Sequence, residues 1–365
     1  MQISISRNEC LFLNQSRFKQ RRRQHSHHPR FNRMPLLRAV GMDDLAVDAK
    51  NLGVSFTPIH EDFGADVLGM DLDGGISEAQ GALVKDALDR FLLLRFRQQT
   101  PEPADEAKLL SFLPHDEERF KRGEFKTFIS TTVPGFSWLA IAAQNMDSDD
   151  NNGSTSKRPK RTGRRTWHMD ASQRLCPHMY SYMYMKIAAP NAGTAFASTV
   201  KAYSLLTDEQ KQIAHKNGAL PELFKATYTM RESGVSYENP RQLEELVKSS
   251  YPGARMVEDG GPFVIQEKGT GVRSLLATPF TVHSFEGMSV EETHELLEEF
   301  LGPQGATAPE RVWIADWQPG DVIVWKNRQL IHASPAPGSY DEPRLNHLAF
   351  WESSEPVIPV EDVAA

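Results

Sequence analysis

Apolar and polar positions along the chain form short runs that predict a sheet-rich fold. Several runs place a large apolar residue at every second position, as expected of strands with one buried face. The strand-like runs are residues 92–97, 179–188, 194–198, 262–266, 272–277, 321–326 and 344–351. Many short strands and few helices predict a mainly β fold with flanking helices (α+β), in which the helices pack outside an antiparallel barrel or sandwich.

Four segments carry the start signals of helices. In three of them a Ser or Thr is followed three residues later by Gln or Glu, which is the pattern of a capping box. In the fourth, an Asn precedes a Pro at the first helical position. These helices are expected to begin at Ser77, Thr207, Ser289 and Asn239.

Two stretches lack any such periodicity. Residues 1–40 contain nine Arg or Lys and a single acid, Glu9, a composition typical of a transit peptide. A disordered leader and an RNA-binding arm are alternative interpretations. We therefore expect a disordered or targeting leader over 1–50 and a single domain over 51–360. Within that domain, residues 147–165 are acidic and then basic with almost nothing apolar, which predicts a flexible loop.

The composition narrows the class of protein. Hydrophobic residues make up 39% and charged residues 24% of the 365 positions, which excludes wholesale disorder and a coiled coil. Two cysteines exclude a disulfide scaffold or an iron–sulfur cluster. With a net charge of -7, no nucleic-acid partner is expected, and no apolar run approaches the roughly 20 residues of a membrane span. We expect an intracellular soluble protein, in the cytoplasm or, if the leader is a transit peptide, in a mitochondrion or plastid.

One constellation of residues is typical of a metal site. His168 and Asp170 are two residues apart, so in an extended segment both point to the same side. With the distant His332 they supply two imidazoles and a carboxylate. On one face of a metal this set leaves three positions open, as in the facial triad of non-haem Fe(II) oxygenases. His60 and Asp62 have the same spacing, but no comparable strands surround them, so we interpret them as a surface turn.

From about Phe56 to Ser353 the chain resembles the taurine dioxygenase/TfdA-type family of Fe(II)- and 2-oxoglutarate-dependent dioxygenases. The resemblance rests on blocks of sequence whose order and spacing are specific. They are EDFGADVLGMDL, LLLRFRQQ, WHMDAS, GTAFAS, DWQPGDVIVWKNRQLIHASP and PRLNHLAFW. The final blocks also resemble the fungal xanthine dioxygenases. The resemblance implies a double-stranded β-helix core, the jelly-roll or cupin-like barrel.

The resemblance also implies an activity and its cofactors. The enzyme would use Fe(II), 2-oxoglutarate as cosubstrate and O2, and would release succinate and CO2. The implied iron ligands are His168, Asp170 and His332, and the residues implied to bind 2-oxoglutarate are Arg344, Thr194 and Trp325. The alternative role for Thr194 and Trp325 is ordinary packing within a strand. The alternative role for Arg344 is a salt bridge on the surface. Halogenating relatives replace the carboxylate with a small residue, so Asp170 favours hydroxylation, desaturation or oxidative ring closure.

The substrate is expected to be a small, carboxylate-bearing metabolite. In this resemblance Leu348 and Phe350 replace polar residues that contact sulfonates or purines in two known branches, and they leave that wall apolar. Arg164 and Arg165 precede the WHMD block and could bind a carboxylate, although a solvated basic loop is the alternative. The alternative functions are a xanthine-type purine hydroxylase and a non-catalytic, cupin-like metal-binding protein. The sequence is compatible with a homo-oligomer.

Overall fold

The computed structural model describes residues 42–125, 127, 131–144, 167–172, 176–189, 193–219, 224–226, 262–276, 282–285, 288–333, 342–353 and 357. Its helices are α1 (Met42–Asn51), α2 (Glu78–Phe91), α3 (Pro103–Ser111), α4 (Glu117–Lys121), α5 (Thr199–Leu205), α6 (Asp208–Ala219), α8 (Val290–Leu301) and the short 3-10 helix η2 (Pro309–Arg311). Its strands are β1 (Ser55–Pro58), β2 (Ala65–Leu68), β3 (Leu93–Phe96), β4 (Thr132–Val133), β5 (Phe136–Gln144), β6 (Tyr180–Ile187), β7 (Gly193–Ser198), β8 (Phe224–Ala226), β9 (Val264–Gln266), β10 (Arg273–Leu275), β11 (Val282–Phe285), β12 (Trp313–Asp316), β13 (Asp321–Lys326), β14 (Leu330–Ala333) and β15 (Arg344–Trp351).

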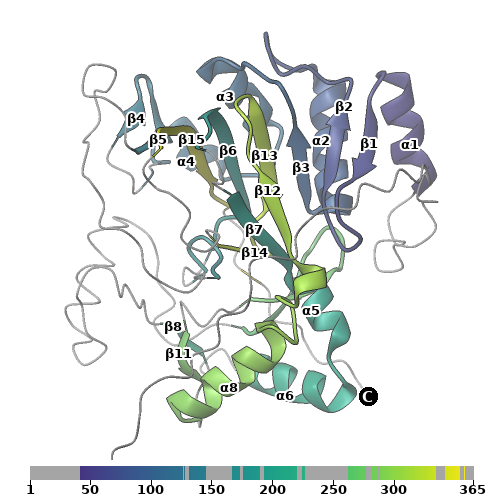
Figure 1. Ribbon diagram of the computed structural model, residues 1–365, viewed down its shortest axis with the longest axis vertical. Coiled ribbons are helices and arrows are strands. Elements are labelled where there is room, and N and C mark those ends of the chain that lie inside the picture. The colour runs from purple at the N-terminus through teal and green to yellow at the C-terminus, as the bar shows by residue number, and fades with distance from the viewer. Residues whose placement is uncertain are drawn as a thin grey trace, which may run out of the picture.

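Two sheets face one another across a hydrophobic cluster (Figure 1). The larger has eight strands in the order β1-β2-β3-β13-β6-β15-β5-β4, and its pairs are antiparallel except for β2 with β3. The smaller has the order β12-β7-β14. Phe196 and Leu330 of the small sheet pack in one buried cluster with Ile323 and Trp325 of the large sheet. This arrangement confirms the prediction of a double-stranded β-helix with flanking helices.

Strand β6 shows how the sequence assigns each face of the large sheet. Tyr180, Tyr182 and Tyr184 alternate along it with Ser181 and Met183. The tyrosines belong to the outer hydrophobic cluster, which is shared with helices α2 and α3. Because side chains alternate across a strand, Ser181 and Met183 point to the inner face, toward the smaller sheet. One set of alternating side chains on β6 therefore packs in the outer hydrophobic cluster, and the other set lines the space between the two sheets.

Helices cover the outer faces of both sheets. Figure 1 shows α1 and α2 beside strands β1–β3, while α6 and α8 lie at the other end of the molecule. The helices predicted from Ser77, Thr207 and Ser289 are present as α2, α6 and α8, and the capping boxes at Ser77 and Ser289 are formed. The helix predicted from Asn239 lies outside the described residues. Helix α3, which the sequence pattern did not predict, packs Leu109 and others into the outer cluster.

Helix α1 (Met42–Asn51) overlaps the end of the segment 1–50 that the sequence analysis assigned to a leader. Its Ala49 is buried in the same cluster as Leu83 of α2. The expected leader up to residue 41 lies outside the described residues. In the described part of the chain, no helix combines the length and apolar character needed to cross a bilayer.

Candidate metal centre

Two histidines from distant parts of the chain lie side by side. His168 and His332 exchange two backbone hydrogen bonds, each 2.9 Å from nitrogen to oxygen, and form an isolated antiparallel bridge. Their ring centroids are 4.2 Å apart. His332 lies on β14 opposite Phe196 of β7, so its side chain points to the inner face of the small sheet. The bridge therefore extends the small sheet by one residue and carries His168 to the interior.

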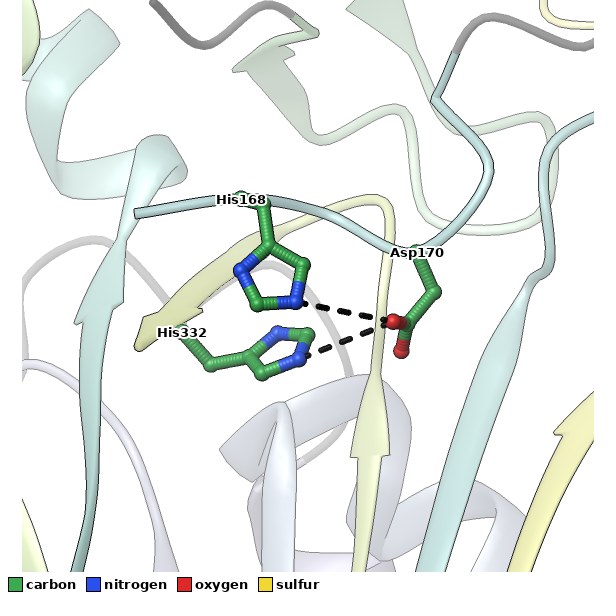
Figure 2. A group of neighbouring side chains, drawn as sticks. All are labelled: His168, Asp170 and His332. Carbon is green, nitrogen blue, oxygen red and sulfur yellow. Dashed lines mark ion pairs between the residues drawn. The ribbon is translucent and has the colours of Figure 1, made fainter. Parts of the chain in front are cut away.

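Asp170 completes a group of three side chains (Figure 2). Its Oδ1 lies 3.8 Å from His168 Nε2 and 3.7 Å from His332 Nε2. One nitrogen or oxygen of each of the three residues lies within 4.8 Å of the others. Among the described residues, no second group of three His, Cys, Asp or Glu comes as close together. The His60–Asp62 turn is not part of this group: His60 Nε2 lies 3.1 Å from the carbonyl of Glu310 instead.

The group fits a transition-metal ion. Separations of 3.7–3.8 Å exceed hydrogen-bond length, yet they are shorter than two metal–ligand bonds of about 2 Å each. Burial, and then the neighbouring His168, lower the pKa of His332 to about 3. The His332 imidazole is therefore neutral near pH 7, the form that donates a lone pair to a metal. Two nitrogens and one oxygen on one side leave positions for further ligands, as in the facial triad.

Thr194 and Trp325 both lie near this group on the inner faces. The side chain of Thr194, on β7, is buried, and its Oγ1 accepts a 2.9 Å hydrogen bond from Trp317 Nε1. The Trp325 ring meets that of His332 edge to face, with centroids 5.3 Å apart. Trp325 Nε1 is buried and has no hydrogen-bond partner among the described residues. A buried N–H group of this kind leaves a donor available to a ligand.

The last strand supplies Arg344, Leu348 and Phe350. Arg344 Nη2 lies 3.8 Å from Met183 Sδ, which places the guanidinium on the inner side of β6. Leu348 pairs with Met183 and Phe350 with Ser181, so all four side chains belong to the inner face. Leu348 and Phe350 are only half-buried, whereas the outward-facing Ala349 between them is fully buried.

Some predicted residues lie outside the described part of the chain, and others were missed. The residues outside the described part are Arg164, Arg165 and the loop predicted over 147–165. The sequence pattern gave no role to Ser181, Asn327 or Trp317, although each contacts a candidate site residue. Asn327 stands within the WKNRQLIH block, five residues before His332. Trp317 stands near the start of the same quoted block, so both residues had a signal in the sequence. The contact of Ser181 depends on how distant segments of the chain pack together.

Comparisons with known proteins identify the family of the chain. The family described as "Taurine catabolism dioxygenase TauD, TfdA family" matches residues 55–349. Pentalenolactone F synthase of Streptomyces avermitilis is 24% identical over 320 residues, which span 82% of this chain and 95% of the relative. The alpha-ketoglutarate-dependent 2,4-dichlorophenoxyacetate dioxygenase of a Burkholderia species is 24% identical over 75% of this chain and 86% of its own.

A solved structure supports the fold. The crystal structure of AAD-2 in complex with Mn(II) and N-oxalylglycine superimposes with a TM-score of 0.63 at 22% identity. The match covers 85% of this chain and 99% of that one. The chain belongs to the TauD/TfdA family of 2-oxoglutarate-dependent dioxygenases, enzymes that use Fe(II), 2-oxoglutarate and O2.

Proposed function

We propose that this dioxygenase oxidises a C–H bond of a small, carboxylate-bearing metabolite by hydroxylation, desaturation or oxidative cyclisation. The convergence of His168, Asp170 and His332 carries the proposal, because it provides a metal site with three open positions. When bound, Fe(II) would activate O2, which oxidises both 2-oxoglutarate, to succinate and CO2, and the substrate. The side chains of the protein hold the metal, orient the two organic molecules and exclude water.

Three side chains are proposed to bind 2-oxoglutarate. A guanidinium matches a carboxylate in shape and charge, and Arg344 presents one on the inner side of β6. The Thr194 hydroxyl accepts from Trp317, so its own hydrogen can be donated to the same carboxylate. Trp325, whose Nε1 is buried without a partner among the described residues, lines the space beside His332.

The proposed class of substrate rests on the side chains of β15 that face the space between the two sheets. Leu348 and Phe350 present apolar, half-buried side chains on the inner face. An apolar wall suits a hydrocarbon body, and a charge on Arg164 or Arg165 would bind the carboxylate. The Burkholderia relative is named for 2,4-dichlorophenoxyacetate, which is an apolar ring with a carboxylate and so has both features.

The experiment that tests the proposal is Fe(II)-dependent release of succinate from 2-oxoglutarate over a panel of compounds. The panel contains aryloxy and alkyl carboxylates, modified amino acids, their neutral esters, and xanthine. We expect the acids to stimulate release, the esters to react poorly, and Arg164→Ala or Arg165→Ala to raise KM for the best acid. Turnover of 2-oxoglutarate without substrate should persist in both variants.

Matched variants separate the outcomes. Asp170→Ala and His332→Ala should abolish succinate release, whereas His60→Ala, in the turn of the same spacing, should not. Preference for xanthine, or an unchanged KM in both arginine variants, would contradict the proposal of an anionic substrate. The substrate would then be a purine or another neutral compound. Metal binding without any succinate release would instead support a cupin-like binding protein.

A further inference from the structure

The two carboxylate oxygens of Asp170 have different neighbours. Oδ1 faces both histidine Nε2 atoms, at 3.8 and 3.7 Å, whereas Oδ2 accepts a 2.7 Å hydrogen bond from Ser181 Oγ. We propose that Ser181 and Asn327 are positioning residues that present Oδ1 of Asp170 alone to the metal. This inference rests on the proposed function, because it takes Asp170 to be a metal ligand.

The Ser181 hydroxyl is held firmly by its place in the sheet. Ser181 is 1% exposed and lies on β6, with strands paired on both sides. Its register partners are Trp325 on β13 and Phe350 on β15. Their large side chains share the inner face and flank the hydroxyl. The hydroxyl therefore remains directed at Asp170 Oδ2.

The hydrogen bond to Oδ2 matters because a carboxylate can bind a cation through one oxygen or through both. A hydroxyl bound to Oδ2 favours binding through Oδ1 alone. If both oxygens bound the metal, Asp170 would take one of the three positions that the triad leaves open. An oxo acid that chelates the metal needs two of these positions, and O2 needs the third. Ser181 would thus preserve the capacity of the metal for both.

Asn327 holds the backbone of the same residue. The Asp170 amide donates to Asn327 Oδ1 at 2.8 Å, and Asn327 Nδ2 donates to the carbonyls of Asp170 at 2.8 Å and His178 at 3.0 Å. The Asn327 side chain is completely buried. Its carboxamide thus pairs with both the amide and the carbonyl of Asp170, as the backbone of a neighbouring strand would. The next residue, Ala171, has a φ of 54°, so the chain bends away directly after this clamp.

Asn327 and the third ligand belong to one short segment of the chain, which connects the two sheets. Asn327 lies in the turn between β13 and β14, and His332 lies on β14, where it bridges to His168. The segment from Asn327 to His332, which crosses from the large sheet to the small one, therefore supplies one proposed ligand and fixes the backbone of the other two. The relative positions of the three ligands depend on this segment rather than on the length of chain between Asp170 and His332.

The test is the affinity of the whole protein for Mn(II) alone, measured from the EPR signal of the free ion. Loss of a group that orients a metal ligand weakens metal binding by about 10- to 100-fold. We expect Ser181→Ala to raise the Mn(II) dissociation constant about tenfold, and Ser181→Thr, which keeps the hydroxyl, to restore most of the affinity. In Mn(II)-saturated protein, Ser181→Ala should also weaken 2-oxoglutarate binding measured by calorimetry.

Ser274→Ala is the matched control. Ser274 is also completely buried, and its Oγ donates to the carbonyl of Arg328, which adjoins Asn327. Its removal should lower thermal stability and leave the Mn(II) affinity unchanged. Asn327→Ala should weaken Mn(II) binding at least as much as Ser181→Ala; if it does not fold, the Ser181 series decides alone.

Two results would overturn the inference, and they differ in what else they affect. If Asp170→Ala abolishes Mn(II) binding while Ser181→Ala matches the wild type, Ser181 does not position the ligand and the proposed function stands. If Asp170→Ala leaves Mn(II) binding intact, Asp170 is not a ligand, and both this inference and the proposed metal site are wrong.

Discussion

Several side chains of the site depend on a partner that is remote in sequence. Thr194 is oriented by Trp317, 123 residues later, through the 2.9 Å hydrogen bond to its hydroxyl. Arg344 lies against Met183, 161 residues earlier. Met183 lies on the strand next to that of Arg344, and Trp317 directly follows β12, the strand next to that of Thr194. The surroundings of both site residues are therefore set by the pairing of the strands.

The positive charge of Arg344 leads to a prediction about the binding of 2-oxoglutarate. Arg344→Ala should weaken binding of 2-oxoglutarate to the Mn(II)-loaded protein by about 3 kcal/mol, or about 100-fold, because it removes one half of a buried charge-assisted pair. Titration calorimetry measures this loss, and Mn(II) affinity should not change.

Arg328→Ala is the control for Arg344. The Arg328 guanidinium donates to the Pro177 carbonyl at 3.1 and 2.7 Å, which indicates a structural role. If Arg328→Ala lowered the affinity for 2-oxoglutarate and Arg344→Ala did not, the assignment of Arg344 would be wrong.

At the scale of single elements, local signals and packing do not always agree. The capping box of α2 forms as its sequence predicts, with Ser77 Oγ accepting from the Gln80 amide at 3.2 Å. Four residues after Ser77, Gly81 is a poor helix former. A Cβ at Gly81 would overlap the Phe112 ring, which follows α3. The glycine therefore lets α2 and α3 approach closely.

This close approach predicts how two substitutions in α2 change the free energy of unfolding. Helix propensity favours Gly81→Ala by about 1 kcal/mol, but overpacking costs about 1–3 kcal/mol, so we expect the free energy of unfolding in urea to fall. Ala82→Gly, at the exposed neighbouring position, should lower it by about 1 kcal/mol through propensity alone. A more stable Gly81→Ala protein would show that Phe112 moves aside without cost.

At the scale of the molecule, a buried lysine joins three parts of the fold. Lys326, at the end of β13, is 2% exposed. Its Nζ lies 2.8 Å from Asp89 Oδ1 on α2 and also pairs with Glu267, which follows β9. One cation thus connects the outer helical layer, the large sheet and the β9–β10 hairpin.

Removal of this cation should destabilise the whole domain. Lys326→Met leaves two carboxylates in a partly buried place without their shared cation, and we expect the free energy of unfolding to fall by about 3 kcal/mol. Lys85→Met is the control: Lys85 pairs with the same Asp89 at 3.1 Å, but its side chain is 38% exposed, so the loss should stay below about 1 kcal/mol. Equal losses in urea denaturation would argue against the special role of Lys326.

Features that depend on near neighbours along the chain could be predicted from the sequence alone. The spacing of His168 and Asp170, the alternation along β6 and the capping boxes at Ser77 and Ser289 are all realised in the structure. A strand places alternate residues on one face, and a cap needs only the next three residues. These signals were enough to indicate the fold class and the candidate metal residues.

Contacts between residues that are distant in the chain depend on how the two sheets pair and pack. The bridge between His168 and His332, the grip of Asn327 on Asp170 and the hydrogen bond from Ser181 require particular strand registers. A shift of one residue in such a register would turn each side chain to the opposite face. Short-range patterns do not encode this choice, because the packing of both sheets and their helices fixes it together.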